Sequence, residues 1–287
     1  MKNVGIIGQG FVGNAVFEGL KNFYSLHTLD TDPSKRSSCQ SILELADLVD
    51  QVCFVCLPTP MEKSGECNVE LVKNTLMRLE ESAKILDKNI IAIIKSTVPP
   101  GTTSSFNDFL NRVTCVFSPE FLTEANSVDD FKNQNRIIVG GPRPASTTVK
   151  RMMSKAFPKV PIIKTSSSIA ETVKYFTNCF LATKVSFANE MKQICDGMDI
   201  DFDKVVEYAL YDERIGKSHL SVPGPDGSMG FGGHCFPKDL NAIIFFAKNL
   251  EINPTMMAAV WEKNLDVRPQ AERDWENMVG RAVLEDT

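Results

Sequence analysis

The sequence predicts an α/β fold in which a parallel sheet flanked by helices is followed by an all-helical second domain. Three observations support this prediction. Short apolar runs alternate with helical stretches in the first half of the chain, a glycine-rich turn follows the first run, and continuous helix begins near residue 168. Alternating strands and helices are typical of a parallel sheet. We therefore expect one domain over residues 1–167 and a second over residues 168–287.

A glycine-rich turn, Gly8-Gln9-Gly10-Phe11-Val12-Gly13, follows the apolar strand of residues 4–7. In such a GxGxxG turn the first glycine permits the bend and the second lets a pyrophosphate approach the backbone. The third glycine lets the next helix, here residues 12–21, pack against the strand. The turn therefore predicts a Rossmann-type, doubly wound dinucleotide-binding domain.

A carboxylate ends the second apolar run. Residues 25–29 form this run, and Asp30 follows them near the spacing at which such domains place a ribose-binding acid. A carboxylate there favours NAD over NADP, because it repels a 2′-phosphate. Lys35 follows closely and is a further candidate for cofactor contact, although its positive charge makes that preference less clear-cut.

Two buried-strand patterns stop at hydroxyl residues. Residues 52–57 lead to Thr59, and residues 90–95 lead to Thr97. Ligands of open α/β sheets bind beyond the carboxyl ends of the strands, where both threonines would project. Each threonine alone is equally typical of a turn. The last strands of the sheet are expected at residues 115–117, 137–139 and 161–164.

A long helix is expected to open the second domain. Residues 168–171 read as a capping box, and no glycine or proline follows until about Ile194. Lys174 and Asn178 are four residues apart and share a helical face. We favour a role as joint donors to a developing oxyanion over the alternative of a solvated face. Further helices are expected at residues 239–250 and 254–267.

A second glycine-rich turn opens the segment of residues 230–239, which places a thiol at Cys235 ahead of Pro237, Lys238 and Asp239. Glycines let the backbone approach a ligand, and a neighbouring ammonium favours the thiolate, so the segment suits a nucleophile. The alternative is a tight turn with an incidental cysteine, because free cysteine is usually a small buried hydrophobe.

The composition excludes several classes of protein. The 287 residues are 43% hydrophobic and 23% charged, and the net charge of −5 offers no basic surface for nucleic acid. The apolar runs are strand-sized and the N-terminus lacks a signal-peptide pattern, so we expect no membrane span and a cytoplasmic protein. The eight cysteines and three histidines show no metal-site spacing; Cys53 and Cys56 lie in an apolar run and read as reduced core thiols.

Taken together, these motifs resemble the UDP-glucose/GDP-mannose dehydrogenase family of NAD-dependent enzymes, which oxidise a nucleotide-sugar alcohol to a carboxylate. The resemblance spans nearly the whole chain. It rests on GQGFVG, Asp30 with Lys35, and the segments 57–60, 96–98, 118–124, 174–190, 214–216 and 230–239.

The resemblance implies a four-electron oxidation in which Cys235 forms first a thiohemiacetal and then a thioester. Lys174, Asn178 and Asp239 would stabilise oxyanions or relay protons, and Glu120 would activate water. The candidate residues are, for catalysis, Cys235, Lys174, Asn178, Asp239, Glu120 and Thr97; for the cofactor, Gly8, Gly10, Phe11, Val12, Gly13, Asp30, Lys35, Thr59, Thr97, Glu124 and Lys238; and for the nucleotide-sugar substrate, Glu120, Phe121, Leu122, Lys174, Asn178, Arg214 and Gly232.

The resemblance also implies a homodimer formed by the helical domains, with Arg214 reaching the substrate of the neighbouring subunit. The family has a third domain that binds the substrate's nucleotide, and the present sequence stops before it. Two other functions stay open. A two-electron β-hydroxyacid-type dehydrogenase also uses a Lys-x-x-x-Asn helix but has no use for Cys235. A non-catalytic NAD-binding protein would need none of Cys235, Lys174, Asn178 and Asp239.

Overall fold

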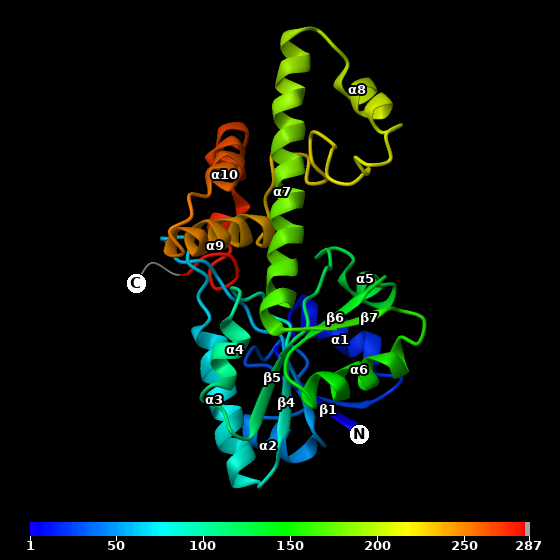
Figure 1. Ribbon diagram of the computed structural model, residues 1–287, viewed down its shortest axis with the longest axis vertical. Coiled ribbons are helices and arrows are strands. Elements are labelled where there is room, and N and C mark those ends of the chain that lie inside the picture. The colour runs from blue at the N-terminus through cyan, green and yellow to red at the C-terminus, as the bar shows by residue number, and fades with distance from the viewer. Residues whose placement is uncertain (285–287) are drawn as a thin grey trace. The chain divides into compact units, whose positions relative to one another are not determined.

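The computed structural model describes residues 1–284, and the chain divides into two compact units (Figure 1). Unit 1 consists of residues 1–59 and 69–174. Unit 2 consists of residues 60–68 and the chain from Tyr175 onward. The final division falls inside the long helix α7 (Ser167–Gly197), which therefore contributes residues to both units.

Unit 1 is built on a sheet that has seven strands within the described residues, in the order β2-β1-β3-β4-β5-β6-β7. Strands β1 to β5 are parallel. Because β2 and β3 lie on opposite sides of β1, the winding reverses there, which confirms the Rossmann-type prediction. The strands are β1 (Asn3–Ile7), β2 (Ser25–Leu29), β3 (Val52–Val55), β4 (Ile90–Ile94), β5 (Val113–Phe117), β6 (Ile137–Gly140) and β7 (Ile162–Thr165).

One junction differs from the all-parallel prediction. Strand β6 runs antiparallel to β5, with Phe117 opposite Gly140, and then pairs in parallel with β7. A parallel neighbour requires a crossover that carries the chain back along the sheet. The connection from β5 to β6 contains only the six-residue helix α5 (Ser127–Lys132), and the chain re-enters the sheet from the end at which it left.

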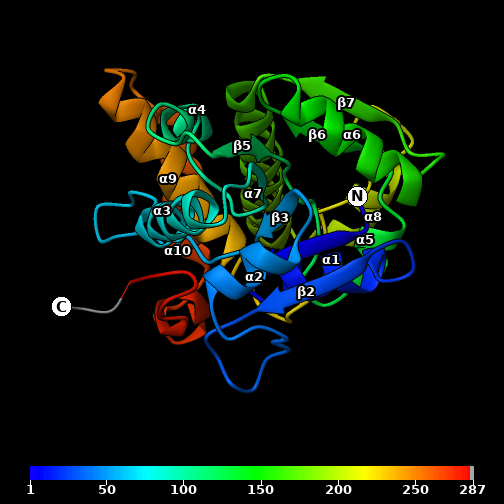
Figure 2. The ribbon, with the colours of Figure 1, turned by 90° about the horizontal axis from the view of Figure 1, so that it is seen from below.

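Helices cover both faces of this sheet, as Figure 2 shows. Alternate residues of each strand point to opposite cores, so that Ile6 and Phe54 pack on one face and Ile7 and Val55 on the other. Burial on both faces explains why the strands read as continuous apolar runs. One face is covered by α1 (Phe11–Leu20), α5 and α6 (Ala145–Ala156), and the other by α2 (Ile42–Leu48), α3 (Glu70–Ile85) and α4 (Thr102–Asn107).

The predicted capping box at residues 168–171 is wrong. Helix α7 begins at Ser167, and the backbone N–H of Ile169 donates to the hydroxyl of Ser166 at 3.3 Å. Ser166 therefore takes the capping role that the pattern assigned to Ser168.

The acid of that pattern, Glu171, serves another helix. Its buried carboxylate accepts hydrogen bonds from the backbone N–H groups of Gly101 at 2.6 Å and Thr103 at 2.8 Å. The first N–H groups of α4 have no partner within their own helix, so Glu171 supplies one. This contact fixes the start of α7 against the segment that follows β4.

Unit 2 is helical. Its main core joins α7 through Cys179 and Ala182 to Leu240 and Val260 of two later helices. Its helices after α7 are α8 (Phe202–Ala209), α9 (Cys235–Asn249), α10 (Thr255–Val267) and the short 3-10 helices η1 (Gln270–Glu272) and η2 (Asp274–Asn277). Helix α9 begins four residues earlier than predicted, so Cys235 is its first residue and not part of the preceding turn.

Residues 60–68 belong to unit 2 although they lie between β3 and α3 in the sequence. They form a hairpin in which Met61 pairs with Cys67. Met61 also pairs with the last described segment: its N–H donates to the carbonyl of Ala282 at 2.8 Å, and its carbonyl accepts from Leu284 N at 3.2 Å.

Candidate active site

The glycine turn of unit 1 lies at the carboxyl end of β1. An added Cβ at Gly8, which has a φ of 87°, would lie 2.3 Å from the carbonyl oxygen of Cys56. An added Cβ at Gly13 would lie 1.9 Å from the carbonyl oxygen of Gly8. At Gly10 no heavy atom of the described residues lies within 4 Å of the added Cβ. The first and third glycines therefore close the turn, and the second borders space that a pyrophosphate would fit.

Asp30, at the end of β2, is joined to this turn. Its carboxylate accepts a hydrogen bond from Gln9 N at 2.5 Å, and from Asp32 N at 2.9 Å. The side-chain oxygen of Gln9 is buried and has no hydrogen-bond partner among the described residues. A buried acceptor without a donor fits a site that binds a polar ligand. Phe11 and Val12 open α1 beside the turn, and Lys35 is exposed in the loop after Asp30.

Polar residues connect the ends of β3 and β4. The Thr59 hydroxyl donates to the carbonyl of Thr97 at 2.7 Å, and the Ser96 hydroxyl accepts from Leu57 N at 2.9 Å. Thr59 and Thr97 are both buried, as expected for residues built into the sheet edge. The structure thus brings the two predicted threonines together at the carboxyl end of neighbouring strands.

A buried ion pair follows β5. The ammonium of Lys174 donates to the carbonyl oxygen of Glu120 at 2.8 Å and to its Oε1 at 2.9 Å. The second carboxylate oxygen of Glu120 accepts from Leu122 N at 2.7 Å. Burial raises the pKa of the Glu120 carboxyl, but Lys174, the Leu122 N–H and Lys95 outweigh burial, so this pKa lies below its usual value. Glu120 is therefore ionised at neutral pH.

Lys95 lies beside the Lys174–Glu120 ion pair, although the sequence predicted it only as the end of a strand. Its ammonium is buried and donates to the carbonyl of Pro119 at 2.9 Å. Burial lowers the pKa of Lys95 to about 8, with Glu120 and Cys56 opposing and Lys174 adding to the shift. The signal in the sequence was a lone lysine closing the apolar run of residues 90–95.

A cavity of about 290 Å³ borders this group in unit 1. Phe121 and Leu122, both proposed for substrate contact, line it together with Glu120 and Lys95. The guanidinium of Arg136 lies 4.0 Å from the centre of the Phe121 ring. Glu124, proposed for cofactor contact, is exposed in the loop before α5.

Unit 2 carries the candidate nucleophile. Cys235 is partly buried at the N-terminus of the 15-residue helix α9, where partial positive charge stabilises a thiolate. Lys238 lies one turn further along and forms a buried ion pair with Asp239. Burial lowers the pKa of Lys238, but Asp239 outweighs burial, with Cys67 and Cys235 contributing, so the pKa lies above its usual value.

Asn178 and Asp239, both candidate catalytic residues, are in contact in unit 2. The side-chain amide of Asn178 donates to Asp239 Oδ2 at 2.6 Å, while Oδ1 accepts from Lys238. Both oxygens of the carboxylate are thus held. Lys174 and Asn178, expected to act together, are each paired with an acid, Glu120 in the first case and Asp239 in the second.

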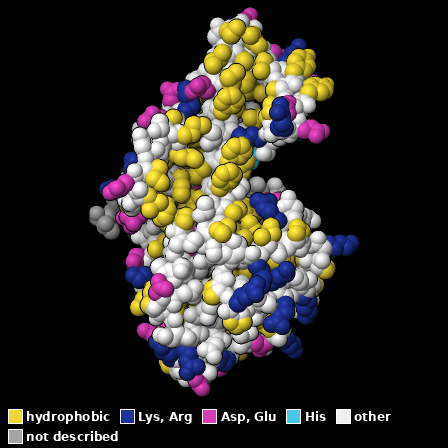
Figure 3. All heavy atoms as spheres, in the orientation of Figure 1, with side chains coloured by type: hydrophobic (Ala, Val, Ile, Leu, Met, Phe, Trp, Pro, Cys, Tyr) yellow, Lys and Arg dark blue, Asp and Glu magenta, His cyan; other side chains and the backbone are white. Residues whose placement is uncertain are grey.

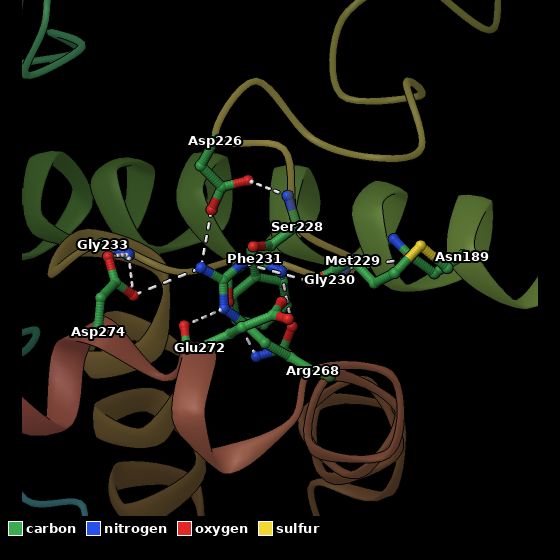
Figure 4. Close-up of polar contacts among 11 residues, drawn as sticks. Asn189, Asp226, Ser228, Met229, Gly230, Phe231, Gly233, Arg268, Glu272 and Asp274 are labelled. Carbon is green, nitrogen blue, oxygen red and sulfur yellow. Dashed lines mark hydrogen bonds and ion pairs between the residues drawn. The ribbon is translucent and has the colours of Figure 1, made fainter.

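Side chains from three elements hold the second glycine turn (Figure 4). Gly230 N donates to Asn189 Oδ1 at 3.0 Å, and Phe231 N donates to Asn264 Oδ1 at 2.7 Å. Gly233 N donates to both oxygens of Asp274, at 3.1 and 3.0 Å. The turn that precedes Cys235 is therefore fixed by α7, α10 and η2.

Arg268 completes this arrangement. Its guanidinium donates to Asp226 Oδ2 at 2.8 Å and to the carbonyls of Met229 and Glu272 at 3.2 and 2.8 Å, and it lies 3.6 Å from Asp274. Asn264, Arg268 and Asp274 were not among the site residues predicted from the sequence. Asn264 lies on α10, and Arg268 directly follows the last residue of that helix. The spacing of four between these two polar residues was the available signal.

The glycines of this turn are packed against the same side chains. An added Cβ at Gly232, proposed for substrate contact, would lie 2.4 Å from Asp274 Oδ1 and 2.5 Å from Arg268 Nη2. At Gly230 it would lie 2.4 Å from Asn264 Oδ1. The remaining glycine, Gly233, has a φ of 70° and no described heavy atom within 4 Å of an added Cβ.

The remaining predicted residue, Arg214, lies in the loop after α8 and pairs with Asp212, which accepts from it through both carboxylate oxygens. The Arg214 side chain is about 90% exposed. Within residues 1–284, which contain all eight cysteines, no disulfide bond forms, and Cys53 lies in the core of unit 1. Residues 1–284 contain no cluster of three or more metal-ligating side chains, and no helix among them has the length and hydropathy to cross a bilayer.

The fold and the glycine turn of unit 1 are those of a dinucleotide-binding protein. Residues 34–158 match the NAD binding domain of the UDP-glucose/GDP-mannose dehydrogenase family, and residues 168–266 match its central domain. The chain belongs to this family, and NAD is the dinucleotide that unit 1 is built to bind.

Two relatives are UDP-glucose 6-dehydrogenases of Bacillus subtilis. TuaD is 31% identical over 301 residues, with 92% of this chain and 63% of the relative covered. YwqF is 30% identical over 257 residues, with 87% of this chain and 56% of the relative covered. The chain thus spans about three fifths of the length of these relatives.

Among solved structures, a UDP-glucose dehydrogenase from Pyrobaculum islandicum matches with a TM-score of 0.82 and 25% identity, over 92% of this chain and 68% of that one. A 3-hydroxyisobutyrate dehydrogenase from Mycobacterium tuberculosis matches with a TM-score of 0.72 over 91% of this chain and 92% of that one. At 15% identity the second match shows a shared fold alone.

Proposed function

We propose that the protein is an NAD-dependent nucleotide-sugar 6-dehydrogenase that oxidises the primary alcohol of UDP-glucose to the carboxylate. The observation that carries this proposal is Cys235 at the N-terminus of α9, one turn from Lys238 and followed by the Asp239–Asn178 pair. An oxidation that stops at the carbonyl needs no nucleophile, whereas oxidation of an aldehyde to an acid does. The related UDP-glucose 6-dehydrogenases support the choice of substrate.

The residues of unit 1 suit NAD. The Gly8–Gly13 turn would receive the pyrophosphate and Asp30 the ribose. The further candidate contacts are Phe11, Val12, Lys35, Thr59, Thr97, Glu124 and Lys238. NAD, when bound, accepts one hydride in each of two oxidations, so two NAD are reduced per substrate.

The role proposed for Cys235 follows from the chemistry of the intermediate aldehyde. After the alcohol has lost a hydride and a proton, the thiolate adds to the aldehyde carbon, and the carbonyl oxygen becomes an oxyanion. Lys174 and Asn178 are proposed to donate to that oxyanion, and Asp239 to relay protons near the thiol through a water. Loss of the second hydride then leaves a thioester on Cys235.

Hydrolysis of the thioester is assigned to Glu120. The low pKa of its carboxyl keeps Glu120 ionised and able to take a proton from water. The hydroxide equivalent adds to the thioester carbon, the C–S bond breaks, and Cys235 leaves as a thiolate. The products are the acid, two reduced NAD and free enzyme, which balances the four electrons.

A homodimer through α7 is part of the proposal. Exposed apolar side chains recur on α7 in unit 2 at intervals of four and seven residues, which return to one helical face: Phe176, Phe180, Phe187 and Ile194. Hydrophobic side chains gather over this helix in Figure 3. Such a continuous patch marks a protein interface, and a second copy supplies a matching surface. The exposed Arg214 would then be available to the partner's substrate. Eight cysteines without a disulfide bond in residues 1–284 support a reducing compartment, which we take to be the cytoplasm.

Light scattering on a sizing column tests the dimer. Phe180→Asp is expected to give a monomer, because it places a charge in the apolar face. Ile85→Asp changes an apolar residue on α3 that is more exposed than Phe180, and it is expected to leave the dimer intact. A monomeric unmodified protein, or a Phe180→Asp dimer, would contradict this part of the proposal.

The activity is tested by counting NADH released per UDP-glucose consumed, with other nucleotide sugars and 3-hydroxy acids as alternatives. Two NADH and a carboxylate product are expected. One NADH from a 3-hydroxy acid would instead support a two-electron β-hydroxyacid-type enzyme. Measurable NAD binding without turnover of any substrate would support a non-catalytic protein.

A further inference from the structure

Asp274 accepts a bifurcated hydrogen bond from the backbone of the second glycine turn. Both of its carboxylate oxygens accept from the N–H of Gly233, two residues before Cys235 (Figure 4). A carboxylate is a strong acceptor, and hydrogen bonds to charged groups are stronger than those between neutral groups. Asp274 therefore fixes the backbone just before the first turn of α9.

Asp274 is itself held by a buried cation. The side chain of Arg268 is 3% exposed and lies between two carboxylates, those of Asp226 and Asp274. Its other N–H groups donate to the carbonyls of Met229 and Glu272. Arg268 thus connects residues 226–229, which lead into the second glycine turn, with the segment that follows α10.

Gly232 packs directly against the Arg268–Asp274 ion pair. An added Cβ there would meet both Asp274 Oδ1 and Arg268 Nη2 at 2.4–2.5 Å. Gly232 therefore leaves room for the ion pair. Arg268 and Asp274 lie after residue 266, where the match to the family's central domain ends.

We infer that Asp274, oriented by Arg268, is a positioning residue that holds Cys235 at the N-terminus of α9 in the geometry its reaction requires. The inference rests on the proposed function of Cys235. Asp274 acts through Gly233 and not on the substrate. Without it the turn relaxes, the first turn of α9 frays, and Cys235 loses the helix N-terminus that stabilises its thiolate.

The test measures the rate at which iodoacetamide alkylates Cys235, as a function of pH. Trypsin releases Cys235 in a peptide spanning residues 218–238 that contains no other cysteine, so mass spectrometry follows this thiol alone. For Asp274→Ala the midpoint of the pH profile is expected to rise by about 0.5 pH unit. The kcat for NADH formation is expected to fall by about 10-fold to 100-fold, with a smaller change in KM.

The sign of the shift separates positioning from simple electrostatics. If Asp274 acted only as a nearby negative charge, its removal would favour the thiolate and lower the midpoint. Asp274→Asn removes the charge but keeps one acceptor oxygen, so positioning predicts a midpoint between those of the unmodified protein and Asp274→Ala. Gly232→Ala displaces the same pair from the other side and is expected to reproduce the Asp274→Ala result.

Glu276→Gln is the matched control. Glu276 lies on the same short helix η2, but its carboxylate pairs with Arg273 at 3.8 Å and not with the turn. It is expected to leave the alkylation profile and kcat unchanged. A lowered or unchanged midpoint in folded Asp274→Ala and Gly232→Ala would overturn the inference. So would a lower Tm with kcat and the profile both unchanged.

The alkylation profile does not depend on turnover. A raised midpoint in a protein that oxidises no nucleotide sugar would support the role of Asp274 and refute the proposed function. Oxidation of UDP-glucose by the unmodified protein, together with an unchanged alkylation midpoint in Asp274→Ala, would support the proposed function and refute the role of Asp274.

Discussion

The two units hold their candidate functional groups by different means. In unit 1, Thr59, Thr97 and Glu120 follow three neighbouring strands, so the register of the sheet brings them to one edge. In unit 2, the turn before Cys235 follows an irregular loop and is held by side chains from α7, α10 and η2. The first arrangement depends on regular backbone, and the second on individual long-range contacts.

The two sites are therefore sensitive to different kinds of substitution. A substitution at the sheet edge of unit 1 changes the charge balance around Glu120 but leaves the strands that position it. A substitution in the contacts of unit 2 changes where the backbone itself lies. Charge variants should therefore dominate the phenotypes of unit 1, and packing or hydrogen-bond variants those of unit 2.

The largest effect is expected from Cys235→Ala. Without a thiolate no thioester forms, so production of the acid is lost while NAD binding to unit 1 is retained. The product is identified by mass spectrometry, and NAD binding by calorimetry. Full acid formation by this variant would remove the covalent mechanism.

In unit 1, Glu120→Gln is expected to have the largest effect. Loss of the general base is expected to lower kcat by about 10²–10⁴-fold. The low pKa of the Glu120 carboxyl places the acid limb of the unmodified enzyme below pH 4.5, and this limb should disappear in the variant. Cys235 alkylation is expected to be unchanged. Altered Cys235 reactivity would show that the two sites are not independent.

Gly10→Ala and Gly13→Ala separate ligand contact from packing within one turn. Gly10→Ala is expected to weaken NAD binding about tenfold, or about 1.4 kcal/mol, with Tm unchanged. Gly13→Ala brings a methyl group against the Gly8 carbonyl and is expected to destabilise the fold by about 1–3 kcal/mol. Calorimetry and thermal unfolding measure the two quantities, and equal loss of stability in both variants would contradict the distinction.

The smallest effect concerns Lys95. Its folded-state pKa of about 8 lies below the ordinary 10.5, so the unfolded chain binds this proton more tightly. The stability of the unmodified protein should therefore rise as pH increases from about 8 to 10.5. Relative to Lys95→Met, urea unfolding is expected to show a gain of about 1–3 kcal/mol across this range. An identical pH dependence of the unfolding free energy in the two proteins would show that folding does not lower the pKa of Lys95.

Local patterns predicted the strands, the first glycine turn and the long helix, because each depends on neighbours in the sequence. Patterns failed where two local options competed. Ser166 and Ser168 both suit a helix cap, and the choice depended on Glu171 pairing with α4. The antiparallel β5–β6 junction likewise depends on the path of a connection that sequence periodicity does not specify.

The candidate site divides in the same way. Residues within motifs, such as Cys235 and Asp239, could be named from the sequence because the residue types themselves indicate the chemistry. Asn264 and Asp274 could not, since each acts through a backbone N–H more than 30 residues away. A lysine such as Lys95 is recognised only when the fold shows that it is buried.

The hairpin of residues 60–68 affects how the chain can be made and cut. Because it belongs to unit 2, the polypeptide passes between the units after Thr59, after Asn68 and after Lys174. After a single break inside α7, the backbone hydrogen bonds of Met61 with Ala282 and Leu284 would still connect the two fragments without a covalent bond. During synthesis, Met61 leaves the ribosome long before Ala282, so its backbone pairing is completed only when almost the whole described chain has been translated.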